Sequence, residues 1–166
     1  MSRPARTATP PPDAVAPSPT PADGPILGPH LPNFAHCHGC GPSMHGGLRM
    51  RVVRDVRRGI EAEVAIAPAH QGAPGLTHGG VLATAMDEAM AFAIWRILNR
   101  PYVTARLETS YLAPVPLGAT LRITATCTGL HGRKAYTEAH ARTDGPVLVH
   151  ATGLWVAPAV SEGGKR

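Results

Sequence analysis

A period of two residues separates apolar from polar positions along much of the chain. Between residues 59 and 66, apolar residues occupy every second position, and polar or small residues stand between them. This is the pattern of a strand with one buried face. Strands are expected in six stretches, namely 47–56, 59–70, 102–116, 119–130, 134–143 and 146–158.

A longer period governs residues 80–99, where a helix is expected. Its apolar residues recur at helical spacing, namely Leu82, Ala85, Met86, Ala89, Met90, Ala93, Ile94 and Ile97. Pro101 and the restricted residue before it predict the end of this helix. Because only short turns join the later strands, the sheet should be antiparallel, and the helix must bury its apolar stripe against it. The fold class predicted is α+β, with one long central helix.

The first part of the chain has a different composition. Residues 1–32 hold ten of the eighteen prolines and few large apolar residues, so this segment cannot offset the entropy of ordering. We expect a disordered tail over 1–32, one globular domain over 33–158 and a second disordered tail over 159–166. Aromatic residues make up only 4% of the chain, so aliphatic side chains and methionine must build the core.

The formal net charge of +5 comes almost entirely from arginine and favours an anionic partner, although a basic surface without one fits equally well. The basic residues do not cluster on one helix and stacking aromatics are scarce, which argues against nucleic acid. No apolar run reaches the length of a membrane span. Three cysteines without repeated spacing suggest a reducing compartment, and the first residues lack a secretory signal, so a cytoplasmic location is expected.

The start of the predicted helix carries the first candidate chemistry. A helix N-terminus leaves backbone N–H groups unpaired and partly positive, and Gly79 and Gly80 have no side chains to block approach to them. Such N–H groups can stabilise an oxyanion, as acyl transfer at a thioester requires. Two acids, Asp87 and Glu88, follow inside the apolar run, and periodicity alone does not decide which of them is functional.

Distance restricts how such an acid can act. Asp87 lies eight residues beyond Gly79, which is roughly 12 Å along one helix. The two residues therefore cannot act on the same carbonyl within one chain. Two helices paired antiparallel across a two-fold axis would bring them together and create two equal sites.

Four segments resemble the hotdog-fold thioesterases of the PaaI type. The most specific is "HQGAPGLTHGGVLATAMDEAM" (70–90), with an acid nine residues after His78, and the supporting ones are 37–52, 103–121 and 129–156. The resemblance covers residues 34–157. It implies an antiparallel sheet wrapped around a helix, and a homodimer, or a dimer of dimers, with sites at the subunit interface. The activity it implies is hydrolysis of a small or medium acyl-CoA thioester, without a cofactor.

The resemblance also assigns roles to residues of this chain. Asp87 corresponds to the catalytic carboxylate, acting as general base or nucleophile, and Gly79 to the oxyanion donor. His78 would orient the thioester carbonyl, and Thr104 would position the attacking water. The family often has Asn or Gln at the position of Gly72.

The remaining candidates would bind substrate. Gln71 would supply the amide that position 72 lacks, and Gly80 lies beside the carbonyl site. The cations expected near the phosphates of coenzyme A are Arg106, Arg133 and Lys134.

Other interpretations stay open beside this one. A hotdog dimer that binds acyl-CoA without turnover would use the same surface. A hydratase or dehydratase would need an Asp/His pair that we do not find. Cys37 and Cys40, with His36 and His45 nearby, have the C-x-x-C spacing of zinc ligands, but no second pair follows. The resembling segment carries no metal in the family, so no metal site is expected here.

Overall fold

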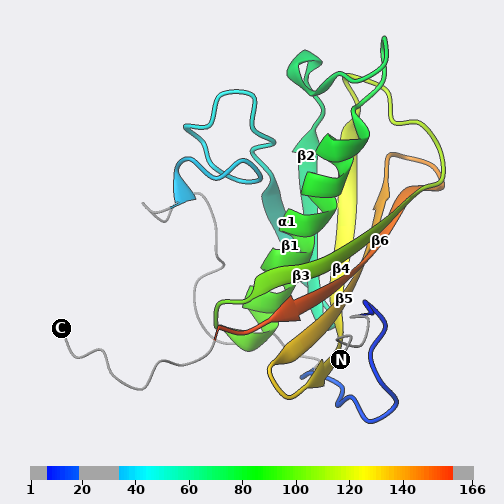
Figure 1. The fold of residues 1–166 in the computed structure, drawn as a ribbon. Helices are drawn as coiled ribbons and strands as arrows, with labels where there is room; N and C mark the ends of the chain where they lie inside the picture. Colours follow the sequence, from blue (N-terminus) through cyan, green and yellow to red (C-terminus); the bar gives the residue numbers. More distant parts are fainter. Residues whose placement is uncertain (1–6, 19–33, 159–166) are drawn as a thin grey trace, which may run out of the picture.

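The computed structural model describes residues 7–18 and 34–158. Within them, six strands and one long helix follow in the predicted order: β1 (Arg51–Val56), β2 (Gly59–Ala65), α1 (Gly79–Leu98), β3 (Val103–Tyr111), β4 (Thr120–His131), β5 (Lys134–Arg142) and β6 (Val147–Val156). A short 3-10 helix, η2 (Pro68–His70), lies between β2 and α1. The strands form one antiparallel sheet in the order β1-β2-β4-β5-β6-β3 (Figure 1). The predicted α+β architecture is confirmed.

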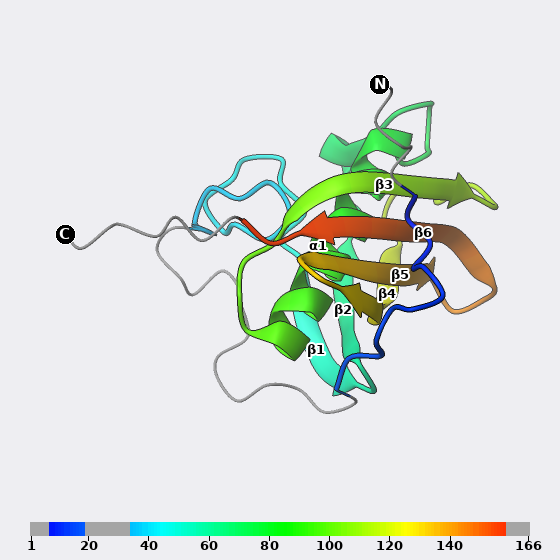
Figure 2. The same ribbon diagram turned by 60° about the horizontal axis from the view of Figure 1, so that its bottom comes forward.

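The sheet curves around α1, which packs against β2, β4 and β5 (Figures 1 and 2). The burial pattern of β4 explains this packing. One face of the strand is fully buried, with Leu121, Ile123, Ala125 and Cys127, while the residues between them are not. Alternate side chains of a strand point to opposite faces. The apolar face of the sheet and the apolar stripe of α1 therefore form a single core.

Helix α1 begins and ends one residue earlier than the predicted range of 80–99. His78 is its N-cap, and Asn99 is its C-cap in the left-handed conformation, with φ of 47°. Asparagine tolerates this conformation better than most residues, and Pro101 prevents the helix from continuing. In the part of the chain that the structure covers, no helix is both long and apolar enough to span a membrane.

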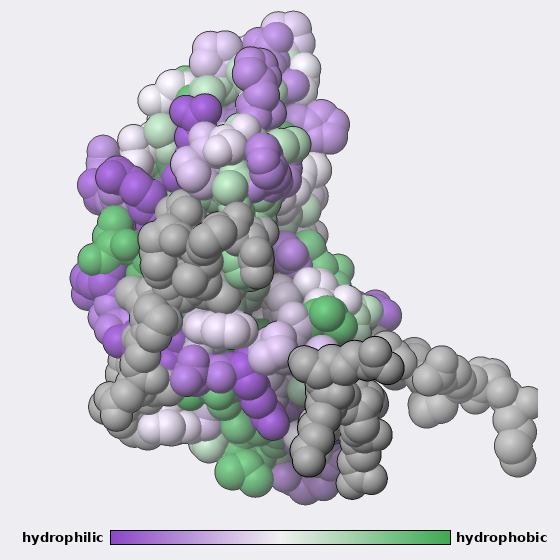
Figure 3. Space-filling view, turned by 90° about the vertical axis from the view of Figure 1, so that its left-hand side faces the viewer, coloured by the Kyte–Doolittle hydropathy of each residue, from purple (hydrophilic) through white to green (hydrophobic). Residues whose placement is uncertain are grey.

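The two edges of the sheet differ in character. Edge strand β3 carries exposed side chains at both ends, including Val103 and Tyr111, which are 58% and 52% exposed. Its outer backbone groups lack a neighbouring strand within the described residues. Edge strand β1 has the charged sequence RVVRDV, and on the side of the molecule shown in Figure 3 hydrophilic residues predominate around the grey segments. Only β3 therefore offers a long, partly apolar edge for pairing.

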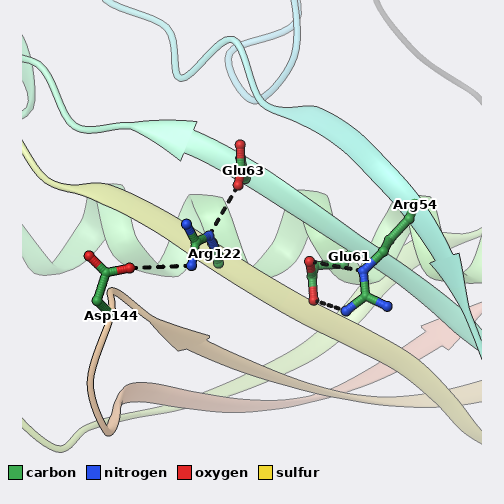
Figure 4. A network of polar contacts seen from close by, with 5 residues as sticks. All are labelled: Arg54, Glu61, Glu63, Arg122 and Asp144. Carbon is green, nitrogen blue, oxygen red and sulfur yellow. Dashed lines mark hydrogen bonds and ion pairs between the residues drawn. The ribbon is translucent and has the colours of Figure 1, made fainter.

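Ion pairs tie β1, β2 and β4 together on the sheet face away from α1 (Figure 4). Arg54 on β1 binds Glu61 on β2 at 2.8 Å, and Arg122 on β4 lies 3.2 Å from Glu63 and 3.3 Å from Asp144. Each pair has at least one well-exposed partner, and exposed ion pairs contribute little to stability. The solvent face of the sheet is thus held together mainly by its backbone ladder.

Residues 7–18, which belong to the tail expected to be disordered, lie beside the end of β4. Val15 and Leu130 exchange two backbone hydrogen bonds of 2.8 Å, and Ala8 is buried. Gly129 admits the segment, since a Cβ at that position would lie 3.1 Å from Pro10. Overall composition does not reveal such single anchoring contacts. The rest of the two predicted tails, residues 1–6, 19–32 and 159–166, lies outside the described residues.

A small polar cluster lies inside the core between α1 and β6. Thr137 Oγ1 accepts a hydrogen bond from Trp155 Nε1 at 2.8 Å and donates one to Met90 Sδ at 2.9 Å. All three residues are buried. Gly153 leaves room for them, because a Cβ there would lie 2.7 Å from both Thr137 Oγ1 and Trp155 Nε1. A buried indole N–H needs an acceptor, and Thr137 provides it.

Replacing Thr137 by Val should destabilise the protein by about 1–3 kcal/mol, because the Trp155 N–H would lose its acceptor while the shape stays nearly the same. Thr137→Ser keeps the acceptor and loses one methyl group, at a cost of about 0.8 kcal/mol. Urea unfolding of the three proteins measures both differences. A Val variant as stable as the wild type would contradict this role of Thr137.

Candidate active site

Asp87 lies in the middle of α1 and faces the edge strand β3. Thr104, near the start of β3, donates a hydrogen bond of 2.9 Å from Oγ1 to Asp87 Oδ1. Burial raises the pKa of Asp87 above its ordinary value, and the bond from Thr104 offsets part of that rise. The carboxylate is therefore a stronger base than an aspartate in water. We call Asp87 and Thr104 the acid half-site.

Glu88 leaves the helix in another direction. Its Oε2 and Oε1 atoms lie 3.6 Å and 3.7 Å from the Sγ atom of Cys37, in the loop before β1. Burial also raises the pKa of Glu88, and the nearby charge of Asp87 adds a smaller rise. Periodicity could not separate the two acids, but their surroundings do, because only Asp87 faces the open edge strand.

The N-terminus of α1 leaves one amide available. His78 Nδ1 accepts the Gly80 N–H at 2.9 Å, and the His78 carbonyl accepts the N–H groups of Val81 and Leu82. The Gly79 N–H has no acceptor within residues 7–18 and 34–158. Of the two glycines in the motif, Gly79 therefore has the free donor. Because His78 Nδ1 acts as an acceptor, the ring proton is on Nε2.

Tyr111, at the end of β3, is a site residue that sequence reasoning missed. Its hydroxyl donates a hydrogen bond of 2.9 Å to the Gly79 carbonyl. Tyr111, His78 and Gly79 line a cleft of about 530 Å³ together with residues 112–115. We call these three residues the amide half-site. In the sequence, Tyr111 looks like an ordinary strand residue. Its position beside Gly79 depends on the pairing of β3 with β6, which the sequence does not reveal.

The loop before α1 explains the absence of an amide side chain at position 72. A Cβ on Gly72 would lie 2.8 Å from the Cα atom of His78, so a larger residue would displace the helix start. Gln71 is exposed, and its Oε1 accepts the Gly75 N–H at 3.2 Å. Its side chain is therefore used inside the loop, and Gln71 does not line the cleft of the amide half-site. The two predicted neighbours, Gln71 and Gly79, are not brought together.

The three candidate cations lie apart from the amide half-site. Arg106 is exposed in the middle of β3 and forms an ion pair with Glu108 on the same strand. Arg133 and Lys134 are exposed in the turn between β4 and β5. In the register of the sheet, Lys134 pairs with Val156, at the end where β3 begins and Thr104 lies. This turn is thus on the side of the acid half-site.

The two half-sites of one chain cannot form one reaction centre. Gly79 and Asp87 are separated by eight residues of a regular helix, roughly 12 Å along its axis. The amide half-site has a free N–H without a carboxylate, and the acid half-site has a carboxylate far from that N–H. Chemically the two are complementary.

Comparisons with known proteins find related sequences and structures. Residues 74–150 match the family model described as the Thioesterase superfamily. Two curated relatives are acyl-coenzyme A thioesterases THEM4. The protein of Xenopus laevis is 35% identical over 92 residues, which are 54% of this chain and 40% of the relative. The protein of Bos taurus is 33% identical over 91 residues, covering 54% and 37%. The chain thus spans less than half the length of these relatives.

Solved structures show the same fold. Protein RHA08564, a thioesterase superfamily protein, is 31% identical, with a TM-score of 0.64 over 74% of this chain and 63% of that chain. A mutant of the phenylacetic acid degradation protein PaaI from Thermus thermophilus is 22% identical, with a TM-score of 0.60 over 66% and 93%. The latter likeness concerns the fold alone. Residues 74–150 of this chain are thus similar to the thioesterase superfamily, and its fold is that of solved thioesterase structures.

Proposed function

We propose that this protein hydrolyses an acyl-CoA thioester to the free acid and CoA, at a site assembled from two copies of the chain. The observation that carries the proposal is the Asp87 carboxylate, which is partly buried, has a raised pKa and is hydrogen-bonded by Thr104. A carboxylate in this state is matched to a role as base or nucleophile. The names of the THEM4 relatives support the thioester class.

The amide half-site supplies what the reaction needs at the carbonyl. The free Gly79 N–H, at the positive end of α1, would donate a hydrogen bond to the thioester oxygen and stabilise the negative charge that develops there. The Nε2–H of His78 is a second donor on the same side. Attack on the carbonyl carbon breaks the C–S bond, and the thiolate of CoA leaves.

Asp87 would act in one of two ways. As a general base, it takes a proton from water, whose oxygen attacks the carbonyl carbon while Thr104 orients that water. As a nucleophile, it forms a mixed anhydride that water then hydrolyses. Both routes use the same residues and the same dimer.

A homodimer follows from the separation of the half-sites. Two antiparallel α1 helices related by a two-fold axis would place the Gly79 of one subunit near the Asp87 of the other, twice. The long exposed edge of β3, which carries Thr104 and ends at Tyr111, is the part of the sheet suited to such pairing. Two such dimers would form the dimer of dimers that the family resemblance implies.

An apolar pocket beside α1, lined by Glu88 and not by Asp87, is a candidate place for the acyl group. It measures about 180 Å³ and is lined by residues that include Phe34, Ala91, Trp95 and Trp155. A dry cavity of about 150 Å³ holds a benzene molecule. A small or medium acyl group, aliphatic or aryl, would therefore fit. Arg106, Arg133 and Lys134 remain the candidates for the phosphates of CoA, with Gly80 beside the carbonyl and Gln71 in the adjoining loop.

Replacing Asp87 by Asn should lower kcat/KM for thiol release from acyl-CoA by about 10²-fold or more, because the amide is neither base nor nucleophile. Stability should stay the same or rise at neutral pH, because burial disfavours the charge that Asn lacks. The measurement is thiol release from a panel of short aliphatic to aryl acyl-CoAs, with thermal unfolding alongside. Bound but unhydrolysed acyl-CoA in the wild type would favour the non-catalytic binding protein.

A mixed dimer tests whether the acid comes from the partner subunit. In the Gly79→Ala chain, the added methyl would touch the Tyr111 ring at 3.5 Å, an ordinary contact that folding tolerates. If this variant is inactive, a dimer that combines it with an Asp87→Asn chain has one site with both changes and one with neither. About half of the wild-type activity should then return. No recovery in a verified mixed dimer would place both groups on one chain.

The pH profile should report the bond between Thr104 and Asp87. Asp87 must be ionised to act, so kcat/KM rises as pH rises through the pKa of Asp87. The hydroxyl of Thr104 stabilises the carboxylate and lowers that pKa. Thr104→Val should therefore move the acid limb to higher pH, while Thr104→Ser, which keeps the hydroxyl, should leave it in place. An unmoved limb in the Val variant would exclude Asp87 as its source.

Two substitutions separate the capping role of His78 from a role at the carbonyl. His78→Ala loses the cap and should cost about 0.5–2 kcal/mol of stability, whereas His78→Asn keeps a capping acceptor. Both variants lack the Nε2–H and should lose activity to a similar degree. Chemical unfolding and kcat/KM measure the two effects. An Asn variant with full activity would show that His78 acts only as a cap.

A further inference from the structure

The loop before β1 places two thiols beside each other. The Gly41 N–H donates a hydrogen bond of 2.8 Å to the carbonyl of Cys37, which closes a tight turn over Cys37-His38-Gly39-Cys40. Gly41 is needed for this closure, because a Cβ there would lie 2.5–2.6 Å from backbone atoms of residues 35 and 37. Cys40 is buried and Cys37 is partly buried, and neither forms a disulfide.

Glu88 reaches this turn from the middle of α1. Its two carboxylate oxygens lie 3.6 Å and 3.7 Å from the Sγ atom of Cys37. Gly39 makes the approach possible, because a Cβ at that position would collide with the carboxylate. One atom each from Cys37, Cys40 and Glu88 lies within 4.8 Å of the others. The turn is thus shaped around the carboxylate of a residue 51 positions away in the chain.

The chemistry of these three groups is that of a metal site. None of the ion pairs found among the described residues involves Glu88, so its carboxylate is not neutralised by a basic side chain there. Thiolate and carboxylate ligands bind Zn²⁺ at about 2.3 Å and 2.0–2.2 Å. At tetrahedral angles these bond lengths place sulfur and oxygen about 3.6 Å apart. The observed separations of 3.6 Å and 3.7 Å match this spacing.

We propose that Cys37, Cys40 and Glu88 bind one Zn²⁺ ion, which fastens the loop over residues 34–41 to the middle of α1. Three protein ligands leave a fourth tetrahedral position for water. Cys37 and Glu88 also line the apolar pocket beside α1. The metal would therefore form part of the wall of that pocket. This proposal does not depend on the thioesterase reaction.

A second cluster of potential metal ligands must be distinguished from this site. Glu138 and His140 on β5 and His150 on β6 also place ligand atoms within 4.8 Å of one another. There, however, His150 Nε2 lies 2.9 Å from Glu138 Oε1, and the two histidine rings stack at 4.8 Å. This cluster lacks thiolate, and its side chains are 31–42% exposed. Its histidines serve as an internal control.

The test is metal analysis and Co²⁺ titration of the full chain, purified under reducing conditions. Cobalt replaces zinc at such sites and gives a thiolate-to-cobalt charge-transfer band that histidine and carboxylate ligands do not produce. The variants are Cys37→Ala, the isosteric Glu88→Gln, and the double variant His140→Ala/His150→Ala, each checked for folding by circular dichroism. The choice of Cys37 over the buried Cys40 limits damage to the core.

We expect about one zinc per chain and a strong charge-transfer band in the wild type. Removing a ligand should weaken Co²⁺ binding by about tenfold or more in folded Cys37→Ala and Glu88→Gln, whereas the histidine variant should bind like the wild type. Zn²⁺ should raise the melting temperature of the wild type but not of Glu88→Gln. Absence of the band from fully reduced wild type, or binding that is lost only in the histidine variant, would overturn the proposal.

Discussion

The close packing of α1 on the sheet determines where each polar group of the helix lies. Ala85, Ala89 and Ala93 are fully buried, and their short side chains let the helix backbone come near the strands. A helix in such a contact cannot rotate without bringing charged groups into the core, which costs several kcal/mol. Successive residues leave a helix about 100° apart. Asp87 and Glu88 are therefore held on two different flanks, one toward β3 and the other toward the loop before β1.

This arrangement gives the neighbouring acids separate surroundings at a cost in stability. Both carboxylates have raised pKa values because burial disfavours their charge, and the charge of Asp87 adds to the rise at Glu88. Their hydrogen-bond partners are a hydroxyl and thiols, which compensate less than a guanidinium would. Groups held in this state are typical of functional sites rather than of structural ones.

Local patterns were sufficient to predict the sheet and the helix. The alternation in β2 and β4, the stripe from Leu82 to Ile97 and the stop before Pro101 depend on residues close in sequence, and these elements lie where they were expected. The family resemblance assigned catalytic roles to both Asp87 and Thr104, and the structure joins the two by a hydrogen bond. A helical period alone could not choose between Asp87 and Glu88.

What escaped prediction depends on contacts between distant segments. The carboxylate beside Cys37 comes from Glu88 on α1. Tyr111 contacts Gly79 because the end of β3 lies beside the start of the helix. No spacing rule connects such positions. Residues 7–18 also meet the sheet through a contact between distant segments, the bridge between Val15 and Leu130. Gln71 was expected beside the carbonyl, but its amide oxygen is engaged within its own loop.

The edge strand β3 has a property that only symmetry brings out. In an antiparallel pairing of two identical strands, the numbers of facing residues have a constant sum. If the axis passed through Leu107, each Arg106 would face a Glu108 across the junction, because these positions lie one step on either side of it. A shift of the axis to either charged residue would instead set that residue against its own copy, and like charges directly opposite repel. One pair of opposite charges, two residues apart on the same strand, can thus select the register of a whole assembly.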